Sequence, residues 1–340
     1  MIKVKIYELD KHRNETTFRP YIMAQNVLRE IGIEFTNGDS YDFAWVGQAS
    51  FMNKKVSLQQ STEDGLEFLS KITGDYMLFD GQDATTLLGS YDVFKESNAL
   101  LLLKNSLLKD RELYKQGWNT GRIYWGPGNY SCKDFDIYSE KIQLSGTNWL
   151  SAIPKPNWFN NTRKIRDVGA VFGLYPEDAE NMEHECNQVP FYNKHRKQCL
   201  DVVNKLDGLT MSTGIPKQMS MQEYLSTMAL NKIILSPHGY GEMNPRDIEA
   251  ISYGCIVIKP DMSYIDTNPN WYENDKTYIA CKNDFSDLEE KIHYVLDNFD
   301  ELQNTMIPYA RRQFTKLYQP ENVAIYLHSM FKNLKGIEPE

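Results

Sequence analysis

Short apolar runs alternate with helical patterns along most of the chain. In the first half, runs typical of strands lie at 4–9, 41–47, 75–80, 99–105 and 121–126, and helical spacing covers 20–31 and 63–72. Strands that alternate with helices pair in parallel and bury both faces of the sheet under helices. This alternation predicts an open α/β domain.

A second series of the same kind follows an irregular stretch at 127–165 that is rich in Pro, Asn, Gly and Trp. Strands are expected at 167–174, near 210, at 232–236 and at 255–260, with helices at 192–206, 221–229 and 245–252 and a helical tail at 287–335 that is interrupted near Tyr318. A chain of 340 residues also favours two cores over one. We therefore expect two Rossmann-like domains, at 1–150 and 151–320, that face each other across a cleft, with a terminal helix at 321–340 that packs back on the first.

Charge and composition exclude several classes of function. The net charge of -9 argues against a nucleic-acid partner. Five cysteines without a CxxC pair suggest neither a zinc cluster nor a disulfide framework and fit a reducing compartment. The start MIKVKIYELD reads as a strand rather than a leader, and no run approaches the ~20 apolar residues of a membrane helix. We expect a cytoplasmic protein without a transmembrane segment, in the host cytoplasm if the chain is viral.

The most informative stretch is ILSPHGYGEMNPRDIEAISYGCIVIKPD, at 234–261, which reads as strand, turn, helix and strand. Turns at the carboxyl edge of a parallel sheet are where open α/β folds bind ligands. The helix that starts at Pro245 offers free N–H groups to an anion, and Arg246 in its first turn can form a fork to phosphate oxygens. Glu249 lies on the same helical face and can accept hydrogen bonds from a ribose. Phosphate together with ribose indicates a nucleotide.

Structural interpretations of the same residues stay open at this point. The turn and the Arg–Glu pair are equally compatible with a helix cap and a surface ion pair. His238 fits an ordinary loop histidine, and Glu242 and Asp247 fit acids that stabilise the N-terminus of a helix.

The stretch resembles the donor-binding signature of exostosin-type glycosyltransferases. The matching residues are Pro237, Gly239, Tyr240, Pro245, Arg246, Glu249, Ala250, Gly254 and Cys255. It is also similar to a broad group of bacterial and viral glycosyltransferase-like proteins that carry Gly-Tyr-Gly-Glu and Lys-Pro-Asp. The chain departs from the exostosin pattern at Ile256, where that pattern has proline, and an extra Gly-Glu lengthens its turn. The choice of sugar donor is therefore not carried over.

The resemblance implies a GT-B architecture, in which the second domain binds a nucleotide-sugar donor and the first binds the acceptor. It implies a glycosyltransferase, for hexosyl or pentosyl groups, that acts on a glycan or a protein without a metal or other cofactor. In these carried-over roles Arg246 binds the diphosphate and Glu249 the ribose. The rest of the donor-binding set is His238, Gly239, Tyr240, Gly241 and Glu242.

An inverting reaction requires a base for the acceptor hydroxyl, whereas a retaining one does not. Asp80 and Asp83, in the turn after the strand at 75–80, are the candidates, and Asp83 is preferred because it lies further out. Both also suit turn-forming or capping roles.

The sequence also carries weaker signals and is compatible with other functions. Asp134 and Asp136 form a D-x-D pattern in the irregular stretch, which we attribute to chance. NKHRK at 193–197 favours a solvated basic face over a second diphosphate contact. A non-catalytic nucleotide- or carbohydrate-binding protein with a GT-B fold and, less favoured, a nucleotide-sugar epimerase remain alternatives.

Overall fold

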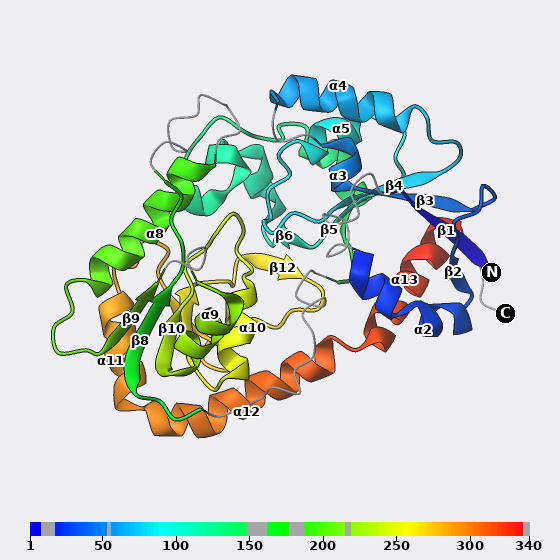
Figure 1. Cartoon of the computed structure of the whole chain (residues 1–340). Coiled ribbons are helices and arrows are strands. Elements are labelled where there is room, and N and C mark those ends of the chain that lie inside the picture. Colours follow the sequence, from blue (N-terminus) through cyan, green and yellow to red (C-terminus); the bar gives the residue numbers. More distant parts are fainter. Residues whose placement is uncertain (8–17, 53–55, 148–161, 177–187, 215–218, 336–340) are drawn as a thin grey trace.

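The structure, a computed structural model, describes residues 1–7, 18–52, 56–147, 162–176, 188–214 and 219–335. Figure 1 shows two α/β domains that lie side by side, with the chain passing from the first to the second and its terminal helix returning to the first. The predicted α/β class with two Rossmann-like domains is confirmed. In the described part of the chain, no helix is both long and apolar enough to cross a membrane.

The first domain contains a six-stranded parallel sheet in the order β2-β1-β3-β4-β5-β7. Its strands are β1 (Ile2–Tyr7), β2 (Ile33–Phe35), β3 (Phe43–Gly47), β4 (Tyr76–Asp80), β5 (Leu102–Lys104) and β7 (Ile142–Leu144). Its helices are α2 (Gln25–Glu30), α3 (Gln48–Phe51), α4 (Leu58–Leu69), α5 (Ser90–Glu96) and α6 (Phe135–Tyr138), with 3-10 turns η1 (Arg111–Lys115) and η4 (Ser139–Lys141). Buried apolar side chains cover both faces of this sheet. Because β7 belongs to it, the stretch predicted to be a linker is in part a strand of the first domain.

The second domain repeats the plan with a five-stranded parallel sheet in the order β13-β11-β10-β8-β9. Its strands are β8 (Arg166–Val171), β9 (Met211–Gly214), β10 (Asn231–Leu235), β11 (Ile256–Pro260) and β13 (Ile279–Cys281). Its helices are α8 (Val189–Val203), α9 (Met221–Ala229), α10 (Pro245–Ser252), α11 (Leu288–Asp297) and α12 (Phe299–Leu317). The predicted helices at 221–229 and 245–252 are confirmed residue for residue.

The terminal helix α13 (Pro320–Lys335) lies beside α2 of the first domain (Figure 1). Its buried face joins the core on one side of the first sheet, where the Phe331 ring stacks on Trp45 with centroids 6.0 Å apart. The chain thus crosses between the domains a second time through α12 and α13. This crossing places both ends of the described chain in the first domain.

A two-stranded antiparallel sheet, which the sequence did not predict, joins the domains. It pairs β6 (Ser106–Leu108) of the first domain with β12 (Ile265–Thr267) of the second. Beside it, Arg111 Nη2 lies 2.8 Å from Asp266 Oδ2. The domains are therefore connected by backbone hydrogen bonds as well as by side chains.

The prediction of a strand at 121–126 is wrong. The segment instead forms two 3-10 turns, η2 (Asn119–Gly121) and η3 (Ile123–Trp125). Thr120 has φ 48°, and Gly121 and Gly126 have φ 74° and 90°. These left-handed conformations are incompatible with an extended strand, and glycine adopts them without strain. The turns bring Arg122 and Tyr124 to the boundary between the domains.

Candidate functional site

The turn that follows β10 leads directly into α10, at the carboxyl edge of the second sheet. Pro245 is the first residue of α10, and Asn244 N donates a weak hydrogen bond of 3.4 Å to Asp247 Oδ2. Asp247 is fully buried, 3.0 Å from Lys259 Nζ, and accepts hydrogen bonds from Ser236 Oγ and Tyr272 OH. The start of α10 is therefore fixed by a buried ion pair.

A cavity of about 400 Å³ lies against the first turns of α10. The loop after β8, α8, the start of α9 and α10 border it. Its lining residues are Gly173, Leu174, Tyr175, Tyr192, Arg196, Met219, Met221, Tyr224, Asn244, Pro245, Arg246 and Glu249. We call this the donor cavity. A cavity of this size, mostly apolar with a few charged groups, is typical of a small-molecule site.

Two guanidinium groups from different helices face the donor cavity. The Cζ atoms of Arg246 and Arg196 lie 5.5 and 5.6 Å from the centroid of the Phe172 ring. Both side chains are buried, and neither has a carboxylate within 4 Å among the described residues. Burial and the neighbouring Arg246 lower the pKa of Arg196 to about 9, so Arg196 remains charged near neutral pH.

Backbone carbonyls and one hydroxyl hold the two guanidinium groups in place. Arg196 Nη1 donates to Gly173 O at 2.8 Å, and Arg246 Nη1 makes a long contact of 3.4 Å to Ser236 Oγ. Arg246 Nε has no hydrogen-bond partner in the described part of the protein. A buried charged donor without a partner is costly, so this arrangement favours an anionic ligand.

Glu249 lies one helical turn beyond Arg246 and lines the same cavity. Its Oε2 accepts a 2.8 Å hydrogen bond from Tyr224 OH of α9. Burial raises the pKa of Glu249, and the Tyr224 hydroxyl and Arg246 oppose the shift. The Tyr224 hydroxyl thus holds one oxygen of a carboxylate that lines the donor cavity.

The rest of the predicted donor-binding set lies between the domains and does not line the donor cavity. Tyr240 O accepts hydrogen bonds from Arg122 Nε at 2.5 Å and from Tyr124 OH at 3.0 Å. Gly241 packs on the first domain so closely that a Cβ there would lie 2.1 Å from Asp83 O. Only glycine fits at this point, because any side chain would collide with backbone. Gly239 N donates to Gly241 O across the turn.

Glu242 is fully buried at the domain boundary. Its carboxylate accepts hydrogen bonds from Thr85 N at 3.1 Å and Thr85 Oγ1 at 2.7 Å, and its backbone oxygen accepts one from Lys259 Nζ. Burial raises the pKa of Glu242, and the Thr85 hydrogen bonds and Arg122 oppose the shift. In this conformation Glu242 links the two domains.

His238 is fully buried between Tyr124 and His195. Its ring centroid lies 4.7 Å from that of Tyr124 and 5.4 Å from that of His195, onto which it stacks. Neither ring nitrogen has a hydrogen-bond partner among the described residues. Burial, together with Lys259, holds the pKa of His238 well below its usual range, so the ring is neutral.

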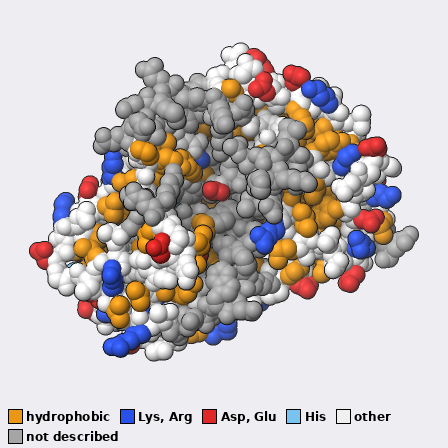
Figure 2. All heavy atoms as spheres, in the orientation of Figure 1, with side chains coloured by type: hydrophobic (Ala, Val, Ile, Leu, Met, Phe, Trp, Pro, Cys, Tyr) orange, Lys and Arg blue, Asp and Glu red, His pale blue; other side chains and the backbone are white. Residues whose placement is uncertain are grey.

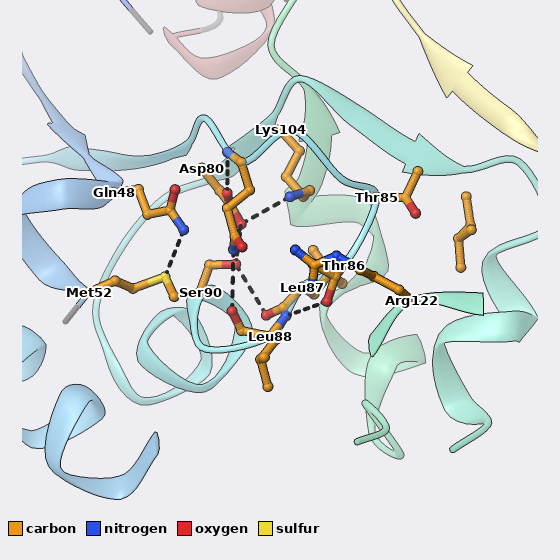
Figure 3. A network of polar contacts seen from close by, with 12 residues as sticks. Gln48, Met52, Asp80, Thr85, Thr86, Leu87, Leu88, Ser90, Lys104 and Arg122 are labelled. Atoms are coloured by element: carbon orange, nitrogen blue, oxygen red, sulfur yellow. Dashed lines mark hydrogen bonds and ion pairs between the residues drawn. The ribbon is translucent and has the colours of Figure 1, made fainter. Parts of the chain in front are cut away.

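The two candidate bases have different surroundings. Asp80 is fully buried, 3.0 Å from Lys104 Nζ, and accepts hydrogen bonds from Ser90 Oγ at 2.5 Å and Gln82 N at 2.9 Å. Figure 3 shows this network, in which Lys104 and Ser90 point toward Asp80. Asp83, by contrast, is exposed, and its backbone touches Gly241 of the second domain. Asp83 is therefore the carboxylate of the two that lies next to the turn at 238–242.

Arg196 is a site residue that the sequence interpretation underrated. NKHRK was expected to form a solvated face, but both His195 and Arg196 are buried. The missed signal is the helical spacing, because Tyr192, Arg196, Cys199 and Val203 recur every three or four residues on the buried side of α8. This placement corrects the interpretation of NKHRK.

The D-x-D residues are occupied by structural contacts. Asp134 Oδ1 accepts a hydrogen bond from Tyr91 OH, and Asp136 forms an ion pair with Lys115 at 2.9 Å. Across the described residues, no group of three His, Cys, Asp or Glu side chains is arranged to hold a metal ion. On the face shown in Figure 2, acidic and basic side chains are interspersed over both domains.

No known family model matches the sequence, and no curated protein matches it. Sucrose-phosphate synthase from Thermosynechococcus elongatus has a similar structure, with a TM-score of 0.50 and 10% identity over 99% of this chain and 100% of that one. The Anabaena protein HepE in complex with UDP-glucose gives a TM-score of 0.47 and 10% identity, over 98% and 100% of the two chains. The likeness to the synthase concerns the fold. The chain has an α/β fold of the GT-B type, built from two Rossmann-like domains.

Proposed function

We propose that the protein is a glycosyltransferase that moves a sugar from a nucleoside-diphosphate donor to a hydroxyl of a glycan or protein. The observation that carries the proposal is the pair Arg196 and Arg246, two buried guanidinium groups that face one cavity without a carboxylate partner in the described chain. The resemblance of 234–261 to the exostosin-type donor signature supports the same assignment.

The electrostatics of the donor cavity favour a diphosphate. Two buried like charges repel each other and lose hydration, and an anion with two charges relieves both costs. The N-terminus of α10 adds further positive potential at Pro245. Guanidinium groups and a helix terminus can stabilise a departing diphosphate in place of a cation. We therefore propose a metal-independent reaction.

The ribose is assigned to Glu249. Its carboxylate lies one turn from Arg246 and is oriented by the Tyr224 hydroxyl. A buried carboxylate that accepts two hydroxyl protons distinguishes ribose from deoxyribose, because the missing hydroxyl would leave a buried acceptor unpaired. We further propose that the sugar moved is a hexose or a pentose.

For catalysis we propose inversion with Asp83 as the base. The acceptor oxygen would attack the anomeric carbon, its proton would pass to Asp83, and the bond from that carbon to the diphosphate oxygen would break with its electrons remaining on the diphosphate. Asp83 is exposed next to the turn at 238–242, whereas Asp80 is engaged by Lys104. Asp80 is thus assigned a structural role.

The experiment is a thermal-shift panel of UDP-, GDP- and CMP-linked sugars, with and without EDTA. A donor that binds the folded state raises the melting temperature by mass action. We expect a shift with one diphosphate donor, unaffected by EDTA and lost in Arg246→Gln and Arg196→Gln. Arg166→Gln is the control, since Arg166 lies on β8 outside the donor cavity.

Three outcomes would contradict the proposal. No shift with any donor in folded protein excludes this donor class, and a shift that requires a divalent ion contradicts metal independence. A donor that binds but is neither transferred nor hydrolysed over hours identifies instead a non-catalytic binding protein.

A further inference from the structure

Tyr192 and Arg196 meet in the wall of the donor cavity. They lie four positions apart on α8, so their side chains share one face of the helix. Both side chains are buried, and both line the cavity. The Cζ atom of Arg196 is 4.1 Å from the centroid of the Tyr192 ring, against 5.6 Å from that of the Phe172 ring. At this distance the face of an aromatic ring attracts a guanidinium group.

The Tyr192 ring is itself held in place by its neighbours. Its hydroxyl donates a hydrogen bond of 3.3 Å to Gly173 O, the carbonyl that also accepts one from Arg196 Nη1. The Tyr175 ring meets it edge-on with centroids 5.2 Å apart, and the Tyr240 ring packs on it at 4.9 Å. The position of the ring therefore depends on several contacts besides the one with Arg196.

The turn after β10 lies against the same pair. A Cβ at Gly239 would be 3.1 Å from Arg196 Nη2 and 3.6 Å from Tyr192 Cε2. Arg196 Nε also makes a long contact of 3.4 Å to His238 O. The ring and the backbone together leave the guanidinium group little room to change its orientation.

The ring stabilises the charge of Arg196 without adding a negative charge to the cavity. No carboxylate lies within 4 Å of Arg196 in the part of the chain that the structure describes. Burial raises the pKa of Tyr192, so its hydroxyl is neutral near neutral pH. A carboxylate in the place of the ring would pair with the guanidinium group and repel an anion. A neutral ring attracts the cation and leaves its N–H groups available to a ligand.

We propose that Tyr192 is a positioning residue of the donor cavity, whose ring holds the Arg196 guanidinium group in one orientation for the diphosphate of the donor. The inference rests on the proposed function, because it takes Arg196 as a ligand of that diphosphate. Since the ring acts through Arg196, its removal should weaken anion binding only while Arg196 is present.

The test is calorimetric titration of the full chain with inorganic diphosphate in low salt. Tyr192→Phe keeps the ring and should bind within about twofold of wild type, whereas Tyr192→Leu removes the ring and should bind about tenfold more weakly. Melting curves show whether each variant is folded. Tyr192→Met is the second variant without a ring, and its flexible side chain can fill the space if Tyr192→Leu does not fold.

A double-mutant cycle separates positioning of Arg196 from a general effect on the structure. In the background of Arg196→Gln, loss of the ring should cause no further loss of affinity. In the background of Arg246→Gln, it should again weaken binding about tenfold, because Arg196 is still present. A merely structural role of Tyr192 would weaken binding in both backgrounds.

Three outcomes overturn the inference and leave the proposed function standing. They are wild-type affinity in the variants without a ring, an equal loss in Tyr192→Phe and Tyr192→Leu, and a tenfold loss that persists in the background of Arg196→Gln. If wild type does not bind diphosphate at all, the arginine pair is not an anion site, and the inference and the proposed function fail together.

Discussion

Glu242 and Thr85 belong to different domains, and the carboxylate of Glu242 accepts hydrogen bonds from both the amide and the hydroxyl of Thr85, at 3.1 and 2.7 Å. Glu242 lies only two residues before Asn244, which borders the donor cavity. The turn that leads to the cavity is therefore held by the first domain. A change in the contacts between the domains should therefore alter the geometry of the donor cavity.

Thr85→Val should destabilise the protein, because it removes one of these hydrogen bonds from a buried carboxylate. We expect a loss of about 1–3 kcal/mol in the free energy of unfolding, measured by urea denaturation. Thr62→Val is the matched control, because the Thr62 hydroxyl donates only to Leu58 O within α4. Equal losses in the two variants would show that the Thr85 hydroxyl contributes no more to stability than a hydroxyl that bonds within one helix.

Inorganic diphosphate should bind the arginine pair without the nucleoside. In low salt it should raise the melting temperature of wild type, and Arg196→Gln or Arg246→Gln should weaken binding by about 1.5–3 kcal/mol, since each removes a charge-assisted hydrogen bond. Titration calorimetry measures the difference. If both variants bind diphosphate with the affinity of wild type, the anion binds at a site other than the arginine pair.

The free energy of unfolding should decrease as the pH is lowered, because buried histidines take up protons when the chain unfolds. The pKa of His195 is about 3 in the folded state, against an ordinary value of 6.5, so the unfolded state binds more protons once the pH falls below 6.5. Stability conferred by neutral His195 is present above that value and is lost as the pH falls. The expected loss from about pH 7 to about pH 5 is about 2 kcal/mol.

His195→Gln should flatten this pH dependence, whereas His293→Gln, which changes an exposed histidine of α11, should not. Denaturation curves at several pH values give the slopes. A slope in His195→Gln as steep as that of wild type would show that other groups cause the acid sensitivity.

The two candidate bases should respond differently to replacement by asparagine. Asp83→Asn should lower kcat by about 10²–10⁴-fold and leave the melting temperature nearly unchanged, because Asp83 is exposed. Asp80→Asn should cost about 3–5 kcal/mol of stability, because it leaves Lys104 buried without its partner. Transfer assays and denaturation of both variants decide the matter. Full activity in Asp83→Asn would indicate another base or a retaining reaction.

The sequence by itself determined the elements whose signals are local. The order of strands and helices follows from apolar periodicity, and α10 was predicted with its observed bounds because Pro245 begins it and the run to Ser252 keeps helical spacing. Arg246 and Glu249 share a helix, so their common position at one cavity was predictable from three-residue spacing.

Only the tertiary structure decided what depends on contacts between distant segments. Arg196 and Arg246 lie far apart in sequence and meet because α8 and α10 both begin at the carboxyl edge of one sheet. The pairing of β6 with β12 and the partners of Asp80 and Glu242 likewise join residues from separate segments. No local pattern encodes such pairs, because register and burial are fixed only when whole elements pack together.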